Sequence, residues 1–320
     1  MIKIIRNNFI FGLISKINIK LLISLVCFVF IGTSIYGNFE ALANQEITLN
    51  EISWLLWAIL FSFLSIIINA YAWKLLINSI GCNSNKLNII KIFLNTNIYK
   101  YLPGGIWHFV TRYNILRKKF SIDKSVESIL LEPLLMLVSG LIFIPFGTLN
   151  VFAFFLCWSS TLIFLTGFRE FIIKKLKGMK SNIFSNSNKP NYIKLDQNSD
   201  QNIQNISMKT LYPYKPLFVE IVFILFRFFG FLCCINAFFN GSLIPQGELI
   251  SSFSLAWIIG LIVPAAPGGI GVFESVILFT LGSQLPEAPL LASLLCYRLV
   301  STISDIIASL VYPMKRLVKG

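Results

Sequence analysis

Charged residues are scarce in this chain of 320 residues. Asp, Glu, Lys and Arg make up 13% of it, about half the share in an ordinary soluble domain, whereas 56% is hydrophobic and 30 residues are Phe. Several apolar runs approach the roughly 20 residues that a helix needs to cross a bilayer. The composition argues against a soluble enzyme and a secreted disulfide scaffold, and it predicts an all-α integral membrane protein.

Patterns that bind metals are also missing. His108 is the single histidine, and the six cysteines form no Cys-x-x-Cys pair. Because a metal site needs several Cys, His or carboxylate ligands at close spacing, the sequence predicts no metal site and no cofactor. Five of the cysteines lie within apolar runs and are interpreted as small packing residues.

Long apolar runs predict about six spanning helices, at 21–37, 52–73, 125–146, 149–167, 217–239 and 289–311. Two further apolar regions, 88–117 and 249–283, are interrupted by Pro-Gly-Gly. We assign 1–167 to a first membrane half, 168–215 to a mobile cytoplasmic loop and 216–320 to a second membrane half. The part of that loop at 174–215 is rich in Lys, Asn and Ser and lacks apolar periodicity, so no soluble catalytic domain is expected.

The basic residues orient the chain. Of the 27 Lys and Arg, 25 fall in 1–20, 74–124, 168–215 and 312–320. The connections at 38–51, 240–248 and 284–288 contain none, and they carry Glu instead. The positive-inside rule then predicts a multi-pass protein of the plasma (inner) membrane with both termini in the cytoplasm. The net charge of +13 is interpreted as a consequence of this topology, with no nucleic-acid partner.

The first span has an alternative interpretation as a signal peptide, because Ala41-Leu42-Ala43 resembles a small-residue cleavage site. The basic region that precedes the span, about 20 residues, is long for a signal peptide. The internal repeat described next also requires that the span be retained.

Two copies of one motif indicate an internal repeat. The segment 103–109 reads Pro-Gly-Gly-Ile-Trp-His-Phe, and the segment 267–273 reads Pro-Gly-Gly-Ile-Gly-Val-Phe, with an offset of 164 residues. The same offset places the span 52–73 at 216–237 and the span 125–146 at 289–310. The flanking spans therefore stay in register, and the charge pattern predicts opposite orientations for the two halves.

Each interrupted region is predicted to be a re-entrant helical hairpin, the first entering from the cytoplasm and the second from outside. Proline lacks an N–H and glycine lacks a Cβ, so Pro-Gly-Gly frees backbone groups within the membrane, where protein or a water-filled cavity must satisfy them. Inverted repeats with broken helices are typical of transporters, whose substrate site lies at the break. The alternative is a simple kink in each helix.

Ionisable residues inside the apolar segments are candidate functional residues, since a charge there is costly unless it is paired. Arg298 and Asp305 lie seven residues apart on one predicted helical face, and Glu220 and Arg227 repeat that spacing. Glu274 lies in the first turn after the second break, where the helix dipole favours a carboxylate. Lys100, His108, Arg112, Glu127 and Glu132 lie around the first break. Ion pairs that only hold the helices together remain the alternative.

The motif Pro264-x-x-Pro267-Gly268-Gly269-Ile270-Gly271-Val272-Phe273-Glu274 resembles the hallmark of the lysylphosphatidylglycerol synthase transmembrane-region family. Lys100-Tyr101-Leu102-Pro103-Gly104 followed by Arg112, and Arg298 with Asp305, resemble further motifs of that family, so the likeness covers roughly 50–312. The resemblance implies lipid handling, as in the flippase half of the multiple peptide resistance factor. This chain carries no aminoacyl-transferring domain after the last span, so synthesis of an aminoacyl lipid is not expected.

These observations predict a non-enzymatic flippase. It would move an anionic or aminoacylated phospholipid, or a polyprenyl-phosphate glycolipid, between leaflets, and its oligomeric state is left open. The rival hypotheses are a membrane-embedded glycosyl or acyl transferase and a non-catalytic partner protein. The predicted substrate-binding residues are Pro103, Gly104, Gly105, Arg112, Arg227, Pro267, Gly268, Gly269, Gly271, Glu274, Arg298 and Asp305.

Overall fold

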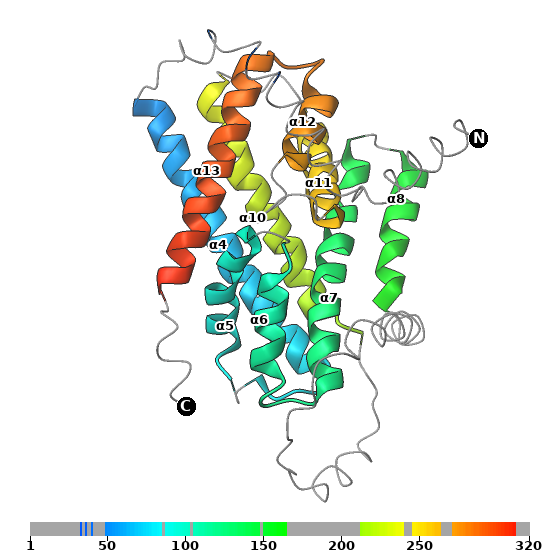
Figure 1. The fold of residues 1–320 in the computed structure, drawn as a ribbon. Coiled ribbons are helices and arrows are strands. Elements are labelled where there is room, and N and C mark those ends of the chain that lie inside the picture. Colours follow the sequence, from blue (N-terminus) through cyan, green and yellow to red (C-terminus); the bar gives the residue numbers. More distant parts are fainter. Residues whose placement is uncertain are drawn as a thin grey trace, which may run out of the picture.

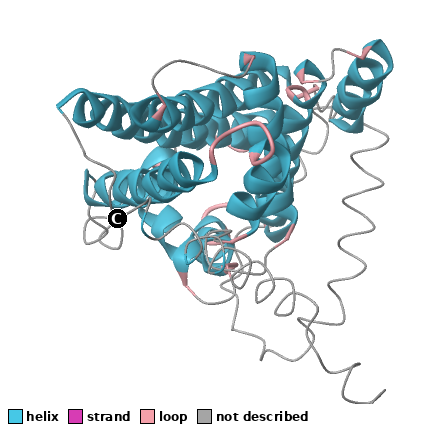
Figure 2. Ribbon diagram, turned by 90° about the horizontal axis from the view of Figure 1, so that it is seen from above, coloured by secondary structure: helices cyan, strands magenta, loops and turns pink. Residues whose placement is uncertain are grey.

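The computed structural model describes residues 33, 36, 40, 49–84, 87–102, 105–147, 150–164, 212–239, 245–263 and 271–311. Within these ranges all regular structure is helical, as Figure 2 shows from above. This confirms the predicted all-α class.

Among the described residues, four helices are long and apolar enough to cross a membrane. They are α4 (Leu49–Ser79), α7 (Ile122–Leu141, continued by the 3-10 turn η3, Ile144–Phe146), α10 (Tyr214–Phe238) and α13 (Glu287–Val311). They coincide with four of the six predicted spans, and the chain is therefore a multi-pass membrane protein.

The other predicted spans have different outcomes. At 149–167 the structure describes a shorter apolar helix, α8 (Val151–Ser159), which continues into the 3-10 helix η4 (Ser160–Phe164). Asn150 caps α8, its Oδ1 accepting the Phe152 N–H at 2.9 Å. The span at 21–37 lies almost entirely outside the described residues, and so do the signal-peptide alternative at Ala41–Ala43 and most of the loop at 168–215.

The two interrupted regions each form two short helices. The first contains α5 (Ile89–Asn97), the 3-10 helix η2 (Ile98–Tyr101) and α6 (Trp107–Leu116), and the second contains α11 (Gln246–Ile262) and α12 (Val272–Leu281). Figure 1 shows α5 and α6 toward one end of the bundle and α11 and α12 toward the other. Both members of each pair contact one another.

Helix starts in the two halves keep the offset found in the sequence. Shifted by 164 residues, the starts of α4, α6 and α7 fall at 213, 271 and 286. Each position is one residue before the start of α10, α12 or α13. These three pairs of helices therefore begin at matching places, whereas the start of α5, shifted in the same way, falls at 253, seven residues after the start of α11.

Close packing of α4 on α10 forms the centre of the bundle. A Cβ built on Gly230 would come within 2.6 Å of Ser62 Oγ and 3.3 Å of the Ala58 carbonyl oxygen. Small residues at such a crossing let helix backbones approach closely, and van der Waals packing of this kind drives helix association in membranes.

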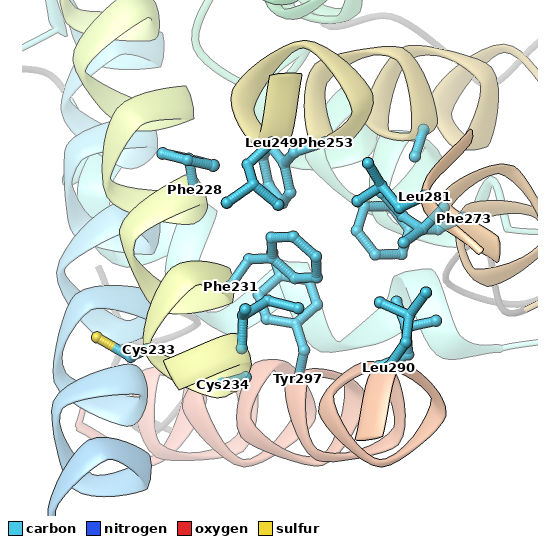
Figure 3. Close-up of a cluster of buried hydrophobic side chains, with 14 of the residues drawn as sticks. Phe228, Phe231, Cys233, Cys234, Leu249, Phe253, Phe273, Leu281, Leu290 and Tyr297 are labelled. Atoms are coloured by element: carbon cyan, nitrogen blue, oxygen red, sulfur yellow. The ribbon is translucent and has the colours of Figure 1, made fainter. Parts of the chain in front are cut away.

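An aromatic cluster joins α10 to α11, α12 and α13 (Figure 3). The Phe231 ring lies 5.4 Å from the Phe253 ring and 5.5 Å from the Tyr297 ring, which in turn lies 5.6 Å from the Phe273 ring. Aromatic pairs at such separations contribute about 0.5–1.5 kcal/mol beyond the area they bury. Because Phe273 and Tyr297 precede Glu274 and Arg298 directly, this cluster positions two of the predicted site residues.

Candidate functional site

A cavity of about 230 Å³ lies where the two interrupted regions meet the long helices. Gly105, the last residue of the first break, and Ile106, which follows it, contribute to the lining, as do Gly260, Leu261 and Phe273, which flank the second break. Its walls are partly apolar, with side chains such as Ile66, Phe93, Met136 and Phe223. Lys100, Arg227 and Arg298 bring positive charge into this setting from η2, α10 and α13.

Asp305 is the carboxylate that holds two of these cations. It is fully buried, and its Oδ2 receives the Lys100 ammonium at 2.7 Å and the Tyr101 hydroxyl at 2.6 Å. Its Oδ1 accepts an N–H of the Asn97 side chain at 2.7 Å and lies 3.9 Å from Arg227 Nη2. Asp305 therefore ties α13 to the first interrupted region and to α10.

Arg227 interacts with Asp305 over a longer distance than Lys100 does, 3.9 Å against 2.7 Å. Its side chain is buried, it lies near the ring faces of Phe223 and Trp257 at 5.9 and 5.6 Å, and its Nε has no hydrogen-bond partner among the described residues. A buried guanidinium with a free N–H beside a cavity is suited to bind an added anion.

Glu274 holds the third cation and also caps a helix. It forms a two-point contact with Arg298, Oε1 with Nε and Oε2 with Nη2, the latter at 3.3 Å. Glu274 Oε2 also accepts the Gly271 N–H at 2.8 Å at the start of α12. Gly271 has φ +96°, a backbone conformation that side chains other than glycine's rarely adopt, so this turn depends on glycine. Arg298 also lies over the Phe273 ring at 5.3 Å.

Arg112 lies behind the cavity wall and does not line it. Its side chain is buried, with Nη1 2.5 Å from Glu132 Oε1 and Nε donating to Thr96 Oγ1 at 3.0 Å. The guanidinium stacks on Phe93 at 3.8 Å and faces Trp73 at 5.1 Å. Glu132 does line the cavity, so this pair connects the wall with the interior of the bundle.

The predicted site residues fall into four groups. Gly105, Arg227 and Arg298 line the cavity. Asp305, Glu274 and Gly271 support those that line it. Arg112 lies behind the wall, and Pro103, Gly104, Pro267, Gly268 and Gly269 lie outside the described residues.

Four further residues of the site are absent from the predicted substrate-binding set: Asn97, Lys100, Tyr101 and Glu132. Of these, Lys100 and Glu132 are among the candidate ionisable residues around the first break. Lys100 and Tyr101 belong to the motif before the first break, and that proximity is a usable signal. Asn97 has no such signal, because an Asn in a short amphipathic helix is ordinary and its contact with Asp305 spans 208 residues.

His108 lines the cavity, and its Nδ1 is buried without a hydrogen-bond partner in the described part of the chain. Within that same part, no group of three or more His, Cys, Asp or Glu side chains is placed to hold a metal ion.

The fold and site define a helical membrane protein with a cavity lined by both cationic and apolar residues. A comparison with models of protein families identifies the family. Residues 17–309 match the lysylphosphatidylglycerol synthase TM region, so the chain belongs to that family. A comparison with curated proteins found no match.

Proposed function

We propose that this protein moves lipids with anionic headgroups between the leaflets of the plasma membrane without chemically altering them. The observation that carries the proposal is the charge of the cavity. Three cations, Lys100, Arg227 and Arg298, are opposed by two carboxylates, Asp305 and Glu274. Glu132, which also lines the cavity, is balanced by Arg112 behind the wall. One positive charge is left over, which matches the single negative charge of a phosphodiester.

The size of the cavity fits the headgroup of a lipid and not the whole molecule. Its volume of about 230 Å³ lies below the roughly 300–1,000 Å³ of pockets that enclose a drug-sized ligand. Acyl or prenyl chains would therefore remain in the bilayer while the headgroup enters. Anionic phospholipids, aminoacylated phospholipids and polyprenyl-phosphate glycolipids all carry a negatively charged phosphate group, which is the part of the headgroup that the cations would bind.

We further propose that the two halves form an inverted repeat with two opposed re-entrant hairpins. The matching helix starts and the position of the short pairs toward opposite ends of the bundle support this topology (Figure 1). In transporters of that design the substrate site lies between the broken helices. Both termini would lie in the cytoplasm, as the distribution of Lys and Arg indicates.

The interactions of Glu274 favour transport over a transferase reaction. A general base must be free to take a proton from the substrate, whereas Glu274 is occupied by Arg298 and by the Gly271 N–H. His108 is the residue on which a transferase hypothesis would then rest.

Purified protein in proteoliposomes tests the proposal with fluorescent lipids whose label can be quenched from outside. The panel contains phosphatidylglycerol, lysyl-phosphatidylglycerol, a polyprenyl-phosphate glycolipid and zwitterionic phosphatidylcholine. We expect faster transbilayer movement of an anionic or aminoacylated class. Charge-assisted hydrogen bonds contribute about 1.5–3 kcal/mol, so Arg298→Gln should slow this movement about 10- to 100-fold.

Arg117→Gln is the matched control, because Arg117 is an exposed arginine just beyond α6 and outside the cavity lining. It should leave the rate unchanged. If the folded protein accelerates the movement of no lipid in the panel, the proposal is wrong. It is also wrong if Arg298→Gln and Arg117→Gln slow the movement equally.

A further inference from the structure

A second group of ionisable residues lies behind the cavity wall, and one of its members, Glu132, reaches the cavity lining. Arg112 on α6, Glu132 on α7 and Glu220 on α10 are 0%, 4% and 1% exposed. Arg112 and Glu132 form the ion pair described above, and the Glu132 carboxylate is the charged neighbour that acts electrostatically on Glu220.

Each member of this group retains a buried polar atom without a hydrogen-bond partner among the described residues. These atoms are Arg112 Nη2, Glu132 Oε2 and Glu220 Oε2. Helix α7, which carries Glu132, packs against both α6 and α10. Buried polar atoms in folded proteins nearly always have a partner, so these three unpaired atoms call for an explanation. Two of the three are carboxylate oxygens, which are the atoms that a proton binds.

Charge counting gives that explanation. With all three groups ionised, the single guanidinium of Arg112 is paired with Glu132, the Glu220 carboxylate has no cation of its own, and the three groups together carry a net charge of −1. A net charge buried among apolar side chains is strongly unfavourable, and a buried carboxyl group in this position takes up a proton instead. Leu131 and Leu135 on α7, Leu217 on α10 and the Trp73 ring belong to the same buried apolar cluster around these elements.

The charged groups on the elements packed against Glu220 offer it no free cation. Asp305 on α13 is a carboxylate bound by Lys100, and Arg227, seven residues along α10, lies 3.9 Å from Asp305. Arg298 on α13 is bound to Glu274. The other titratable or charged residues of α4, α7, α10, α11 and α13 are Glu51, Tyr71, Lys74, Asp123, Lys124, Glu127, Tyr214, Lys215, Cys233, Cys234, Glu248, Glu287, Cys296 and Tyr297. Lys124 donates to the Gly81 carbonyl oxygen and Lys215 lies over the Tyr214 ring, and no residue in the described part of the chain forms an ion pair with Glu220.

We propose that Arg112, Glu132 and Glu220 form a site that holds one exchangeable proton. A proton from water reaches the group through the cavity, where Glu132 forms part of the wall, and binds a carboxylate oxygen to give a neutral carboxylic acid. The reverse step returns the proton to water. The coupling of this site to transport rests on the proposed function. Because Glu132 faces the cavity that the headgroup enters, proton movement at the site would be coupled to headgroup movement.

A proton fits this group better than a metal cation does. Metal cations such as Ca²⁺ and Mg²⁺ take about six or more oxygen ligands, whereas the described residues offer two unpaired carboxylate oxygens here beside the guanidinium of Arg112. A proton needs one carboxylate oxygen.

The number of bound protons can be measured independently of any lipid. Infrared spectroscopy of the full-length protein in lipid at neutral pH resolves the carbonyl stretch of protonated carboxyl groups from the bands of ionised ones. Relative to the wild type, we expect Glu220→Gln and Glu132→Gln each to lose one protonated carboxyl group. Arg112→Gln should gain one, because two carboxylates without the guanidinium take up two protons. Glu287→Gln, which alters an exposed residue at the start of α13, should change nothing.

These variants separate the proton site from the transport proposal. The proton site is overturned if the carbonyl band of protonated carboxyl groups is unchanged in Glu220→Gln, or if Glu287→Gln changes it equally. A band that responds to sodium at constant pH also overturns it. If Arg112→Gln does not fold, Glu132→Gln and Glu220→Gln still determine the number of protonated carboxyl groups. If transport of phosphatidylglycerol is observed, its rate should depend on an imposed pH gradient in the wild type and not in Glu220→Gln. Transport that ignores the gradient refutes the coupling.

Discussion

Arg298 and Asp305 lie seven residues apart on α13, yet they bind different interrupted regions. Arg298 pairs with Glu274 on α12, and Asp305 pairs with Lys100 on η2. Two helical turns separate the two contacts by about 10.5 Å along the axis. One long helix therefore connects both interrupted regions, and the cavity lies where these connections converge.

Removing the charge of Asp305 should destabilise the protein. Asp305→Asn leaves Lys100 and Arg227 without their carboxylate. Breaking a buried ion pair costs about 3–5 kcal/mol, and we expect the lower end because Lys100 is 24% exposed. Thermal unfolding of the purified protein in detergent, followed by fluorescence, should show a clearly lower midpoint.

Asp123→Asn provides the matched control for this change. Asp123 is an exposed carboxylate in the first turn of α7, where the charge contributes about 0.3–1 kcal/mol. If the two variants unfold at the same temperature, the buried network of Asp305 does not stabilise the fold.

A change at His108 separates transport from a transferase reaction. A catalytic base typically contributes about 10²- to 10⁴-fold to a rate. Under the transport proposal His108→Ala keeps lipid movement within about threefold of wild type, because the cavity keeps Lys100, Arg227 and Arg298. Movement of the fluorescent lipid and formation of a modified lipid are measured on the same vesicles. Product formation that His108→Ala abolishes while lipid movement continues would establish the transferase.

The helices could be predicted from the sequence far better than the contacts between them. Apolar runs and Pro-Gly-Gly breaks are local features, so α4, α7, α10 and α13 and the two interrupted regions follow from composition and spacing. The sequence also placed Arg298 and Asp305 on one face of the last span. Their actual partners depend on which helices pack beside α13, and no local pattern contains that information.

The role of Arg112 shows the same limit. Its position after the first break suggested contact with a substrate, but α6 turns it toward Glu132 and the rings of Phe93 and Trp73. That orientation is set by the packing of α5, α6 and α7. Asn97 was missed for the same reason, because its partner lies in the other half of the chain.

The contact between α4 and α10 should tolerate no added methyl group at Gly230. Gly230→Ala brings a Cβ within 2.6 Å of Ser62 Oγ and 3.3 Å of the Ala58 carbonyl oxygen. Overpacking of this kind costs about 1–3 kcal/mol and should lower the unfolding midpoint. Gly260→Ala is the comparison, since its nearest neighbour would be Phe273 Cβ at 4.0 Å. Replacing glycine there should stabilise α11 by up to about 1 kcal/mol. Equal midpoints for the two variants would show that the helices separate easily.

The proposed orientation makes a prediction about labelling from the two sides of the membrane. Figure 1 shows the start of α7 and the start of α13 toward opposite ends of the bundle. Lys118 precedes α7 by four residues, and Glu287 is the first residue of α13. Lys118→Cys and Glu287→Cys are introduced separately after the natural cysteines are replaced. A maleimide that cannot cross membranes should label the Lys118→Cys protein in inside-out vesicles and the Glu287→Cys protein in right-side-out vesicles. Labelling of both from the same side would overturn the inverted-repeat topology, and a reversed pattern would overturn only the orientation of the termini.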